Sequence, residues 1–219
     1  MNRVEIKKEA KEFAFQNKWN IWKPILIVAL ISFAVSFILS LCGLGPQQTT
    51  TDLFGTKITT SSMSTAGSIA LVVVEILLLP LTIGLNYYHI QLTRGKKVEI
   101  NDLFSKYKYL LPIFVIELLV GIFTCLWSIL FIIPGIIYEF SVILVPYLMA
   151  DELDEKTGYM DLINKSREMM KGHKMDYFIL QLSFIGWDLL VGFTFGIASI
   201  WVIPYQTVAN IKFYESLKK

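Results

Sequence analysis

The chain has 219 residues, of which 54% are hydrophobic and 17% are charged, and its formal net charge is +2. A soluble domain of this length does not need so apolar a composition, so we expect a membrane protein. The net charge is too small to indicate a nucleic-acid-binding protein.

Residues 2–22 are predicted to form an amphipathic helix on the membrane surface. Apolar side chains recur there at helical spacing, and lysines and glutamates occupy the other face. Trp19, Trp22 and Lys23 are residue types that anchor a helix among lipid headgroups. The apolar run over residues 24–44 is as long as a span and has no signal-peptide cleavage site after it, so we expect the first transmembrane helix there.

Residues 45–67 are rich in Thr, Ser and Gly and carry few charges. This composition is typical of a mobile loop, so we expect a flexible tether instead of a packed domain. The second span is expected over residues 68–92, with the aromatic pair Tyr87 and Tyr88 near its end. A polar, basic connector follows it.

Residues 109–150 form the longest apolar stretch, and their only charges are two glutamates. A bilayer core about 30 Å thick takes roughly 20 helical residues, so this stretch must cross, turn and return. Pro134 and Gly135 predict where the helix breaks. The third and fourth spans are therefore expected over residues 109–131 and 134–150.

The long hydrophilic connector that follows contains a predicted amphipathic helix over residues 158–171. Its apolar stripe lies opposite a charged stripe, and Gly172 is suited to end it. We expect the apolar stripe to dock on the membrane or on the helix bundle, with a partner that it binds as the alternative. Two further apolar runs, residues 177–193 and 197–214, supply the fifth and sixth spans.

Lysine and arginine are distributed unevenly between the two sides of these spans. Of the 20 Lys and Arg residues, all except Lys57 fall on the side of the N-terminus. The positive-inside rule then places both termini in the cytoplasm. The predicted fold is all-α: residues 1–219 form a single polytopic membrane domain with six transmembrane helices in three hairpins and with cytoplasmic amphipathic helices.

Several segments together form a recognisable combination. They are LMADELDE (148–155), INKSREMMKGHK (163–174), LSFIGW (182–187), GIASIWVIPY (196–205) and FYESL (213–217). With the opening MNRVEIKKEAKEFAFQNKW, they resemble the bacterial integral-membrane family catalogued as domain of unknown function 975. The resemblance implies a multi-span protein of the bacterial cytoplasmic membrane, with no established activity and no catalytic residues to transfer.

Side chains that carry out chemistry are sparse. His89 and His173 belong to no His-Glu-x-x-His zinc motif, and the sequence contains no nucleophile elbow, phosphate loop or dinucleotide fingerprint. Cys42 and Cys125 are apolar in context, so we favour two free thiols over a disulfide. No enzyme activity, cofactor or metal site is therefore expected.

Four acidic residues in the predicted spans form a candidate intramembrane polar site: Glu75, Glu117, Glu139 and Asp188. An ionised carboxylate at a helix centre costs about 2.5–3.5 kcal/mol, and no Lys or Arg within a span can pair with them. We expect the four to share one pocket, with Glu117 the deepest. The pocket would be a cation or proton site. Over this functional interpretation we favour the one in which each acid faces a shallow aqueous vestibule or hydrogen-bonds to a polar neighbour.

Four basic residues at the end of the predicted surface helix form a candidate contact with anionic lipid: Arg167, Lys171, His173 and Lys174. A basic residue near an anionic membrane surface contributes about 1 kcal/mol to binding. The alternative is that these residues act only as topology signals.

Three classes of function are compatible with the sequence. We favour a non-enzymatic helper in an envelope process, such as export, lipid or peptide handling, or immunity to a membrane-active peptide. A small cation- or proton-coupled transporter that uses the intramembrane acids is the alternative, and an intramembrane lipid enzyme is the third. Membrane lipids are the expected partners, a protein partner in the membrane is a further option, and no nucleic acid is expected. The sequence carries no signal for an oligomeric state.

Overall fold

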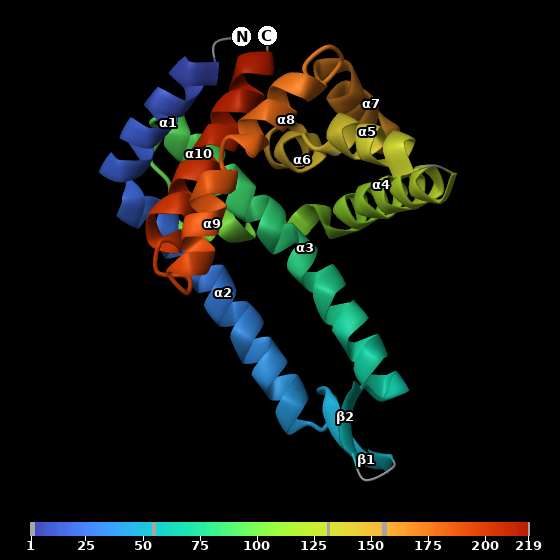
Figure 1. Cartoon of the computed structure of the whole chain (residues 1–219). Coiled ribbons are helices and arrows are strands. Elements are labelled where there is room, and N and C mark those ends of the chain that lie inside the picture. The colour runs from blue at the N-terminus through green and yellow to red at the C-terminus, as the bar shows by residue number, and fades with distance from the viewer. Residues whose placement is uncertain (1–2, 54–55, 131, 155–156, 219) are drawn as a thin grey trace.

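The fold is helical, with one two-stranded hairpin as the exception (Figure 1). The structure, a computed structural model, describes residues 3–53, 56–130, 132–154 and 157–218. Its α-helices are α1 (Arg3–Gln16), α2 (Lys18–Leu41), α3 (Thr65–Thr93), α4 (Leu110–Leu130), α5 (Ile132–Val142), α6 (Val145–Glu152), α7 (Tyr159–Met169), α8 (Lys174–Leu182), α9 (Ile185–Phe193) and α10 (Ser199–Leu217). Two short 3-10 helices, η1 (Ile100–Phe104) and η2 (Tyr107–Tyr109), lie between α3 and α4.

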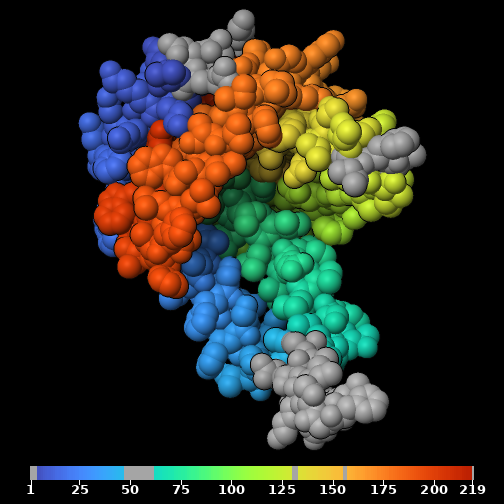
Figure 2. Space-filling model, viewed as in Figure 1, coloured from blue at the N-terminus to red at the C-terminus, as the bar shows by residue number. Residues whose placement is uncertain are grey.

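The long helices α2 and α3 project from the body of the molecule (Figures 1 and 2). They carry the hairpin at their far end (Figure 1). Apolar side chains along this arm are exposed, among them Leu30 and Phe33 on α2 and Ile69 on α3. A soluble protein rarely leaves so long an apolar surface in water. The arm is therefore suited to contact with lipid.

Five segments of the described chain are helical, long and apolar enough to cross a membrane. They are Lys18–Leu41, Thr65–Thr93, Ile100–Ile129, Ile133–Glu152 and Lys174–Phe193. These segments indicate a membrane protein. The expected sixth span, residues 197–214, lies in α10, which is not one of the five, so the six-span topology and the cytoplasmic termini stay predictions.

The N-terminal surface helix is shorter than the sequence predicts, and it contacts protein. One helix is predicted over residues 2–22, but α1 ends at Gln16 and α2 begins at Lys18. Helix α1 lies against α10, and Ala10 and Ala14 on it are buried. Alanine side chains are small, so they let two helices approach closely. Both α1 and α10 reach the end of the body that lies away from the hairpin (Figure 1).

The region predicted as a mobile loop and flexible tether contains an antiparallel hairpin, so it has regular secondary structure. Strand β1 (Gln47–Leu53) pairs with β2 (Thr56–Ser62), and Gln47 lies opposite Ser62 in the register. Threonine is β-branched and favours extended backbone, and these two strands are rich in it. A low charge content therefore does not make this segment irregular.

The predicted turn between the third and fourth spans lies close to the observed one. Helix α4 ends at Leu130, and Pro134 and Gly135 lie in the first turn of α5, where proline is tolerated because no intrahelical donor is needed. A Cβ atom at Gly135 would lie 2.6 Å from Ser128 Oγ, so glycine is needed for α5 to approach α4 this closely. The predicted fourth span divides into α5 and α6, and the fifth divides into α8 and α9.

The core of the body gathers around the last half of α3, α6 and α10. Leu148, Phe213 and Tyr214 are fully buried there. Helix α3 also contacts η1 closely, because a Cβ atom at Gly84 would lie 1.9 Å from the Leu103 carbonyl oxygen. This tight packing fixes the polar connector after α3 against the body.

Candidate functional site

Helix α7 is docked so that its charged face stays open. The helix predicted over residues 158–171 is present as α7, and Ile163 and Ser166 on its inner face are buried. Ser166 Oγ donates a hydrogen bond of 2.8 Å to the Ser141 carbonyl oxygen on α5. Helix α7 also contacts α4 and α6. Its apolar stripe therefore docks on the helix bundle, which was one of the two predicted surfaces.

The charged face of α7 borders a cavity of about 620 Å³, which we call the α7 cavity. One wall, from α4 and α5, is aromatic and apolar, and the opposite wall, from α7 and the residues after it, is cationic. Side chains that define these walls are Trp127, Ile137 and Tyr138 on the first, and Arg167, Lys171 and Lys174 on the second. The cavity therefore combines positive charge with apolar surface.

No carboxylate of the described residues pairs with the three cations of this cavity. Within the described ranges, Arg167 makes one hydrogen bond, from Nη1 to Asn164 Oδ1 at 3.4 Å. Lys171 and Lys174 have no ion pair within the same ranges. Glu168 also lines the cavity, so three cations face one carboxylate. This excess of positive charge attracts an anion.

The aromatic wall is built from ring contacts between α4 and α5. The rings of Trp127 and Tyr138 stack with centroids 6.5 Å apart, and Phe123 lies 6.3 Å from Tyr138. Trp127 is 44% exposed, so part of its ring is open to a ligand or to lipid. Tryptophan and tyrosine are favoured where an apolar region meets headgroups.

His173 does not share the α7 cavity with the other three predicted lipid contacts. Its Nδ1 atom lies 3.0 Å from Asp176 Oδ2. The residue lines a different cavity of about 790 Å³ with Glu9 and Lys212, while Lys171 lines both cavities. The structure thus brings together Arg167, Lys171 and Lys174 and separates His173 from them.

The four predicted intramembrane acids are divided among three places. Glu117 on α4 and Glu139 on α5 line a cavity of about 500 Å³, together with the hydroxyl side chain of Ser128. Glu75 is exposed on α3, away from this cavity. Asp188 on α9 accepts a hydrogen bond of 2.7 Å from Gln206 Nε2 on α10. Two of the four acids therefore lie together.

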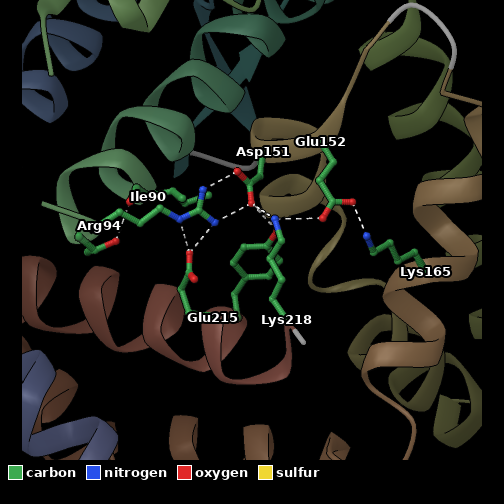
Figure 3. A network of polar contacts seen from close by, with 9 residues as sticks. Ile90, Arg94, Asp151, Glu152, Lys165, Glu215 and Lys218 are labelled. Atoms are coloured by element: carbon green, nitrogen blue, oxygen red, sulfur yellow. Dashed lines mark hydrogen bonds and ion pairs between the residues drawn. The ribbon is translucent and has the colours of Figure 1, made fainter. Parts of the chain in front are cut away.

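Sequence patterns did not predict an ion-pair network at the ends of α3, α6 and α10 (Figure 3). Arg94 donates from both Nη atoms to the two carboxylate oxygens of Asp151, each at 2.7 Å, and from Nε to Glu215 at 2.8 Å. The Tyr214 hydroxyl donates to Asp151 at 3.0 Å. Hydrogen bonding to Asp151 raises the pKa of the Arg94 guanidinium above its ordinary value, so Arg94 stays charged.

Lys218 and Lys165 extend this network to α7. The Lys218 ammonium contacts Asp151 and lies 3.1 Å from Glu152, and Lys165 binds the other oxygen of Glu152 at 2.5 Å. Figure 3 shows the side chains of Arg94, Asp151, Glu152, Lys165, Glu215 and Lys218 pointing toward one another. Arg94 and Asp151 are 57 residues apart in the sequence, and Arg94 and Glu215 are 121 apart. Local spacing in the sequence therefore could not predict these ion pairs.

Cys42 and Cys125 are both free and exposed. Buried His89 contacts the Ile21 carbonyl oxygen through Nε2 at 3.2 Å. No group of three or more His, Cys, Asp and Glu side chains that could hold a metal ion occurs in the described part of the chain.

Comparison with known proteins identifies a family across the chain. The model of the family described as "Protein of unknown function (DUF975)" matches residues 1–143 and 128–219. These two matches cover the whole sequence and confirm the resemblance seen in its motifs. No curated protein and no solved structure matches the chain.

Proposed function

We propose that this chain, which belongs to the DUF975 family of proteins of unknown function, is a non-enzymatic membrane protein that binds anionic lipid at the α7 cavity. The proposal places the protein in a bacterial cytoplasmic membrane, with both termini, α7 and the α4–α5 turn that shares its cavity on the cytoplasmic side. That topology brings the α7 cavity to the leaflet whose anionic headgroups attract basic residues. The protein serves an envelope process such as lipid handling.

One observation supports the proposal above the others: three cations between α7 and the start of α8, which have no carboxylate partner among the described residues, lie beside an aromatic wall. Arg167, Lys171 and Lys174 meet Trp127 and Tyr138 in one cavity. A guanidinium presents a planar fork that matches a phosphate group, and an ammonium adds a second charge. Aromatic rings suit the region just below the headgroups. A lipid phosphate therefore has both its charge and its surroundings matched.

Removing two of these cations tests the proposal. The variant Arg167→Gln with Lys171→Gln should bind phosphatidylglycerol more weakly than the wild type does. Each lost cation is worth about 1 kcal/mol, so the loss is about 2 kcal/mol, or roughly 30-fold in affinity. Binding is measured by titrating the lipid into detergent-solubilised protein and counting bound lipids by native mass spectrometry.

A matched control separates the site from net charge. Lys8 and Lys11 on α1 are exposed, so Lys8→Gln with Lys11→Gln removes the same charge elsewhere. This control should bind phosphatidylglycerol as the wild type does. Equal weakening in both variants would mean that binding follows overall charge, and no weakening in either would refute the lipid site. Inorganic phosphate as a competitor shows whether a free anion occupies the same cations.

A second candidate function is cation or proton transport, which the shared cavity of Glu117 and Glu139 favours. Two carboxylates in one cavity within the predicted spans are suited to exchange a proton or to hold a cation. Proton flux across liposomes that contain the protein distinguishes the two functions. Flux that disappears in Glu117→Gln would support transport, and no flux above that of empty liposomes supports the non-enzymatic helper.

A further inference from the structure

A second cavity continues from the α7 cavity toward α4. It has a volume of about 370 Å³, and we call it the α4 cavity. Trp127, Tyr138 and Arg167 line both cavities, so the two spaces adjoin along these three side chains. Its remaining lining is apolar: Phe123, Leu126, Met160 and Ile163. The two cavities therefore differ in chemistry while sharing a wall.

Polarity changes in one direction across this pair of cavities. Lys171 and Lys174 line only the α7 cavity, and Leu126 and Met160 line only the α4 cavity. Arg167 lies between them, and arginine commonly places its apolar stem along apolar surface while its charged head meets a polar group. This order of cation, guanidinium and apolar wall matches the order of groups in an anionic lipid.

We propose that the α7 and α4 cavities form one site that holds a single phospholipid anion, with its phosphate on Arg167 and Lys171 and one acyl chain along Phe123, Leu126 and Met160. This inference rests on the proposed function and adds that the lipid enters the protein with its chain. Headgroup adsorption alone needs cations but no apolar cavity beside them. The α4 cavity supplies surface that only the hydrocarbon part of the ligand can use.

The charge of the site selects among amphiphilic ligands. Three cations and one carboxylate favour a ligand with a net negative head over a zwitterionic one. The surroundings of the apolar part are methionine, leucine and aromatic rings, and methionine adapts to chains of variable shape. The expected class is therefore an acidic phospholipid such as phosphatidylglycerol, and phosphatidylcholine should bind more weakly.

Filling the α4 cavity tests the chain-binding part separately. Met160 and Leu126 are 39% and 51% exposed, so each can be replaced by a larger side chain without disturbing the core. Met160→Trp should weaken binding of dioleoyl phosphatidylglycerol about tenfold, because the indole displaces the acyl chain. Binding of glycerol phosphate, which has no chain, should not change. Leu189→Trp on α9 is the control, since Leu189 is 58% exposed and lines neither cavity.

A measurement on the unaltered protein covers the case in which a variant folds poorly. Phosphatidylglycerol with a photoreactive group in its acyl chain is bound and irradiated, and the labelled peptides are identified by mass spectrometry. Labelling should concentrate in residues 123–127 and 159–163. Excess glycerol phosphate should reduce this labelling only partly, because it competes for the cations but not for the apolar cavity.

The outcomes separate the two proposals. Unchanged lipid binding by Met160→Trp, with labelling spread evenly over all lipid-facing helices, overturns the chain-binding inference. If Arg167→Gln with Lys171→Gln still weakens binding in that case, headgroup binding at the α7 cavity stands. If neither Arg167→Gln with Lys171→Gln nor Met160→Trp changes lipid binding, both proposals are wrong. Saturable binding of an acidic peptide in place of lipid would also overturn them.

Discussion

Replacing Arg94 with glutamine should destabilise the body of the protein more than the loss of any exposed ion pair. Arg94 makes a two-pronged contact with Asp151 and a third hydrogen bond to Glu215. The substitution removes the charge and the fork while keeping a polar, though shorter, side chain. It therefore separates the end of α3 from α6 and α10 without opening a large cavity.

The expected loss in the free energy of unfolding follows from the burial of Arg94 and Asp151. The Asp151 side chain is 6% exposed and that of Arg94 is 25% exposed. Breaking a buried ion pair by removing one partner costs about 3–5 kcal/mol, because the other charge is left buried. Asp151 keeps Lys218 and the Tyr214 hydroxyl, and Arg94 is partly in solvent, so we expect about 2–3 kcal/mol. In a chain of this length, that corresponds to a fall in Tm of about 4–12 °C.

Thermal unfolding in detergent, followed by tryptophan fluorescence, measures this loss. Lys212→Gln is the matched control because Lys212 pairs with Glu9 at 2.6 Å, but the Glu9 side chain is 54% exposed. An exposed pair of this kind contributes about 0–1 kcal/mol, so the control should shift Tm little. A double-mutant cycle with Asp151→Asn isolates the coupling between Arg94 and Asp151.

Equal Tm values for Arg94→Gln and Lys212→Gln would refute this reasoning. So would a double-mutant cycle with no coupling energy, since the loss from Arg94→Gln would then come from something other than Asp151. A fall in Tm accompanied by unchanged phosphatidylglycerol binding would show that the network stabilises the body without shaping the lipid site.

Two further predictions concern topology and pH. With Cys125 replaced by serine, Cys42 should react with a membrane-impermeant maleimide in intact cells. A cysteine introduced by Lys96→Cys should be protected from the same reagent. Labelling of both positions from outside would contradict the cytoplasmic termini. Burial alone would lower the pKa of Lys218, but its hydrogen bonds to Asp151 and Glu152 outweigh burial and raise the pKa above 10.5. A raised pKa contributes stability that is complete below about pH 10.5 and is lost as the pH rises through the pKa of the folded state. The difference in Tm between the wild type and Lys218→Gln should therefore stay constant up to about pH 10 and disappear above it.

Apolar runs predicted most of the helices because a lipid-facing or buried helix needs continuous apolar sequence wherever it lies. The second span, expected over residues 68–92, is present as Thr65–Thr93, and the third, expected over 109–131, contains Leu110–Leu130. The same pattern cannot locate the breaks between α5 and α6 or between α8 and α9, because apolar residues continue through both. Contacts with other helices decide where those helices end.

The cationic half of the site could be predicted because it is local in sequence. Arg167, Lys171 and Lys174 are close in the sequence and lie between the last turn of α7 and the first residue of α8. His173 lies in the turn between the two helices, after Gly172 with φ +84°, and its ring contacts Asp176. The aromatic half, with Trp127, comes from another helix, and sequence alone gives no relation between the two.

The sequence also could not predict which of the intramembrane acids lie in the same cavity. Counting residues from the end of a span predicts the depth of a carboxylate, but it does not fix the rotation of the helix that carries it. Glu117 and Glu139 meet because α4 and α5 form a hairpin that closes tightly at Gly135. Glu75 and Asp188 belong to helices outside that hairpin, so equal depth does not bring them into the same cavity.

Two cations of α7, Lys165 and Arg167, lie on different faces of the helix and have different neighbours. Lys165 binds Glu152 and thereby joins the network that includes Asp151 and Arg94. Arg167 borders the α7 cavity with no carboxylate partner in the described ranges. A cation already paired with a carboxylate has little free energy left to gain from a phosphate, whereas an unpaired one in an apolar surround has the most to gain. The positive-inside rule counts lysine and arginine alike, so only the pairing pattern separates the residues that hold the helix from those that we propose bind lipid.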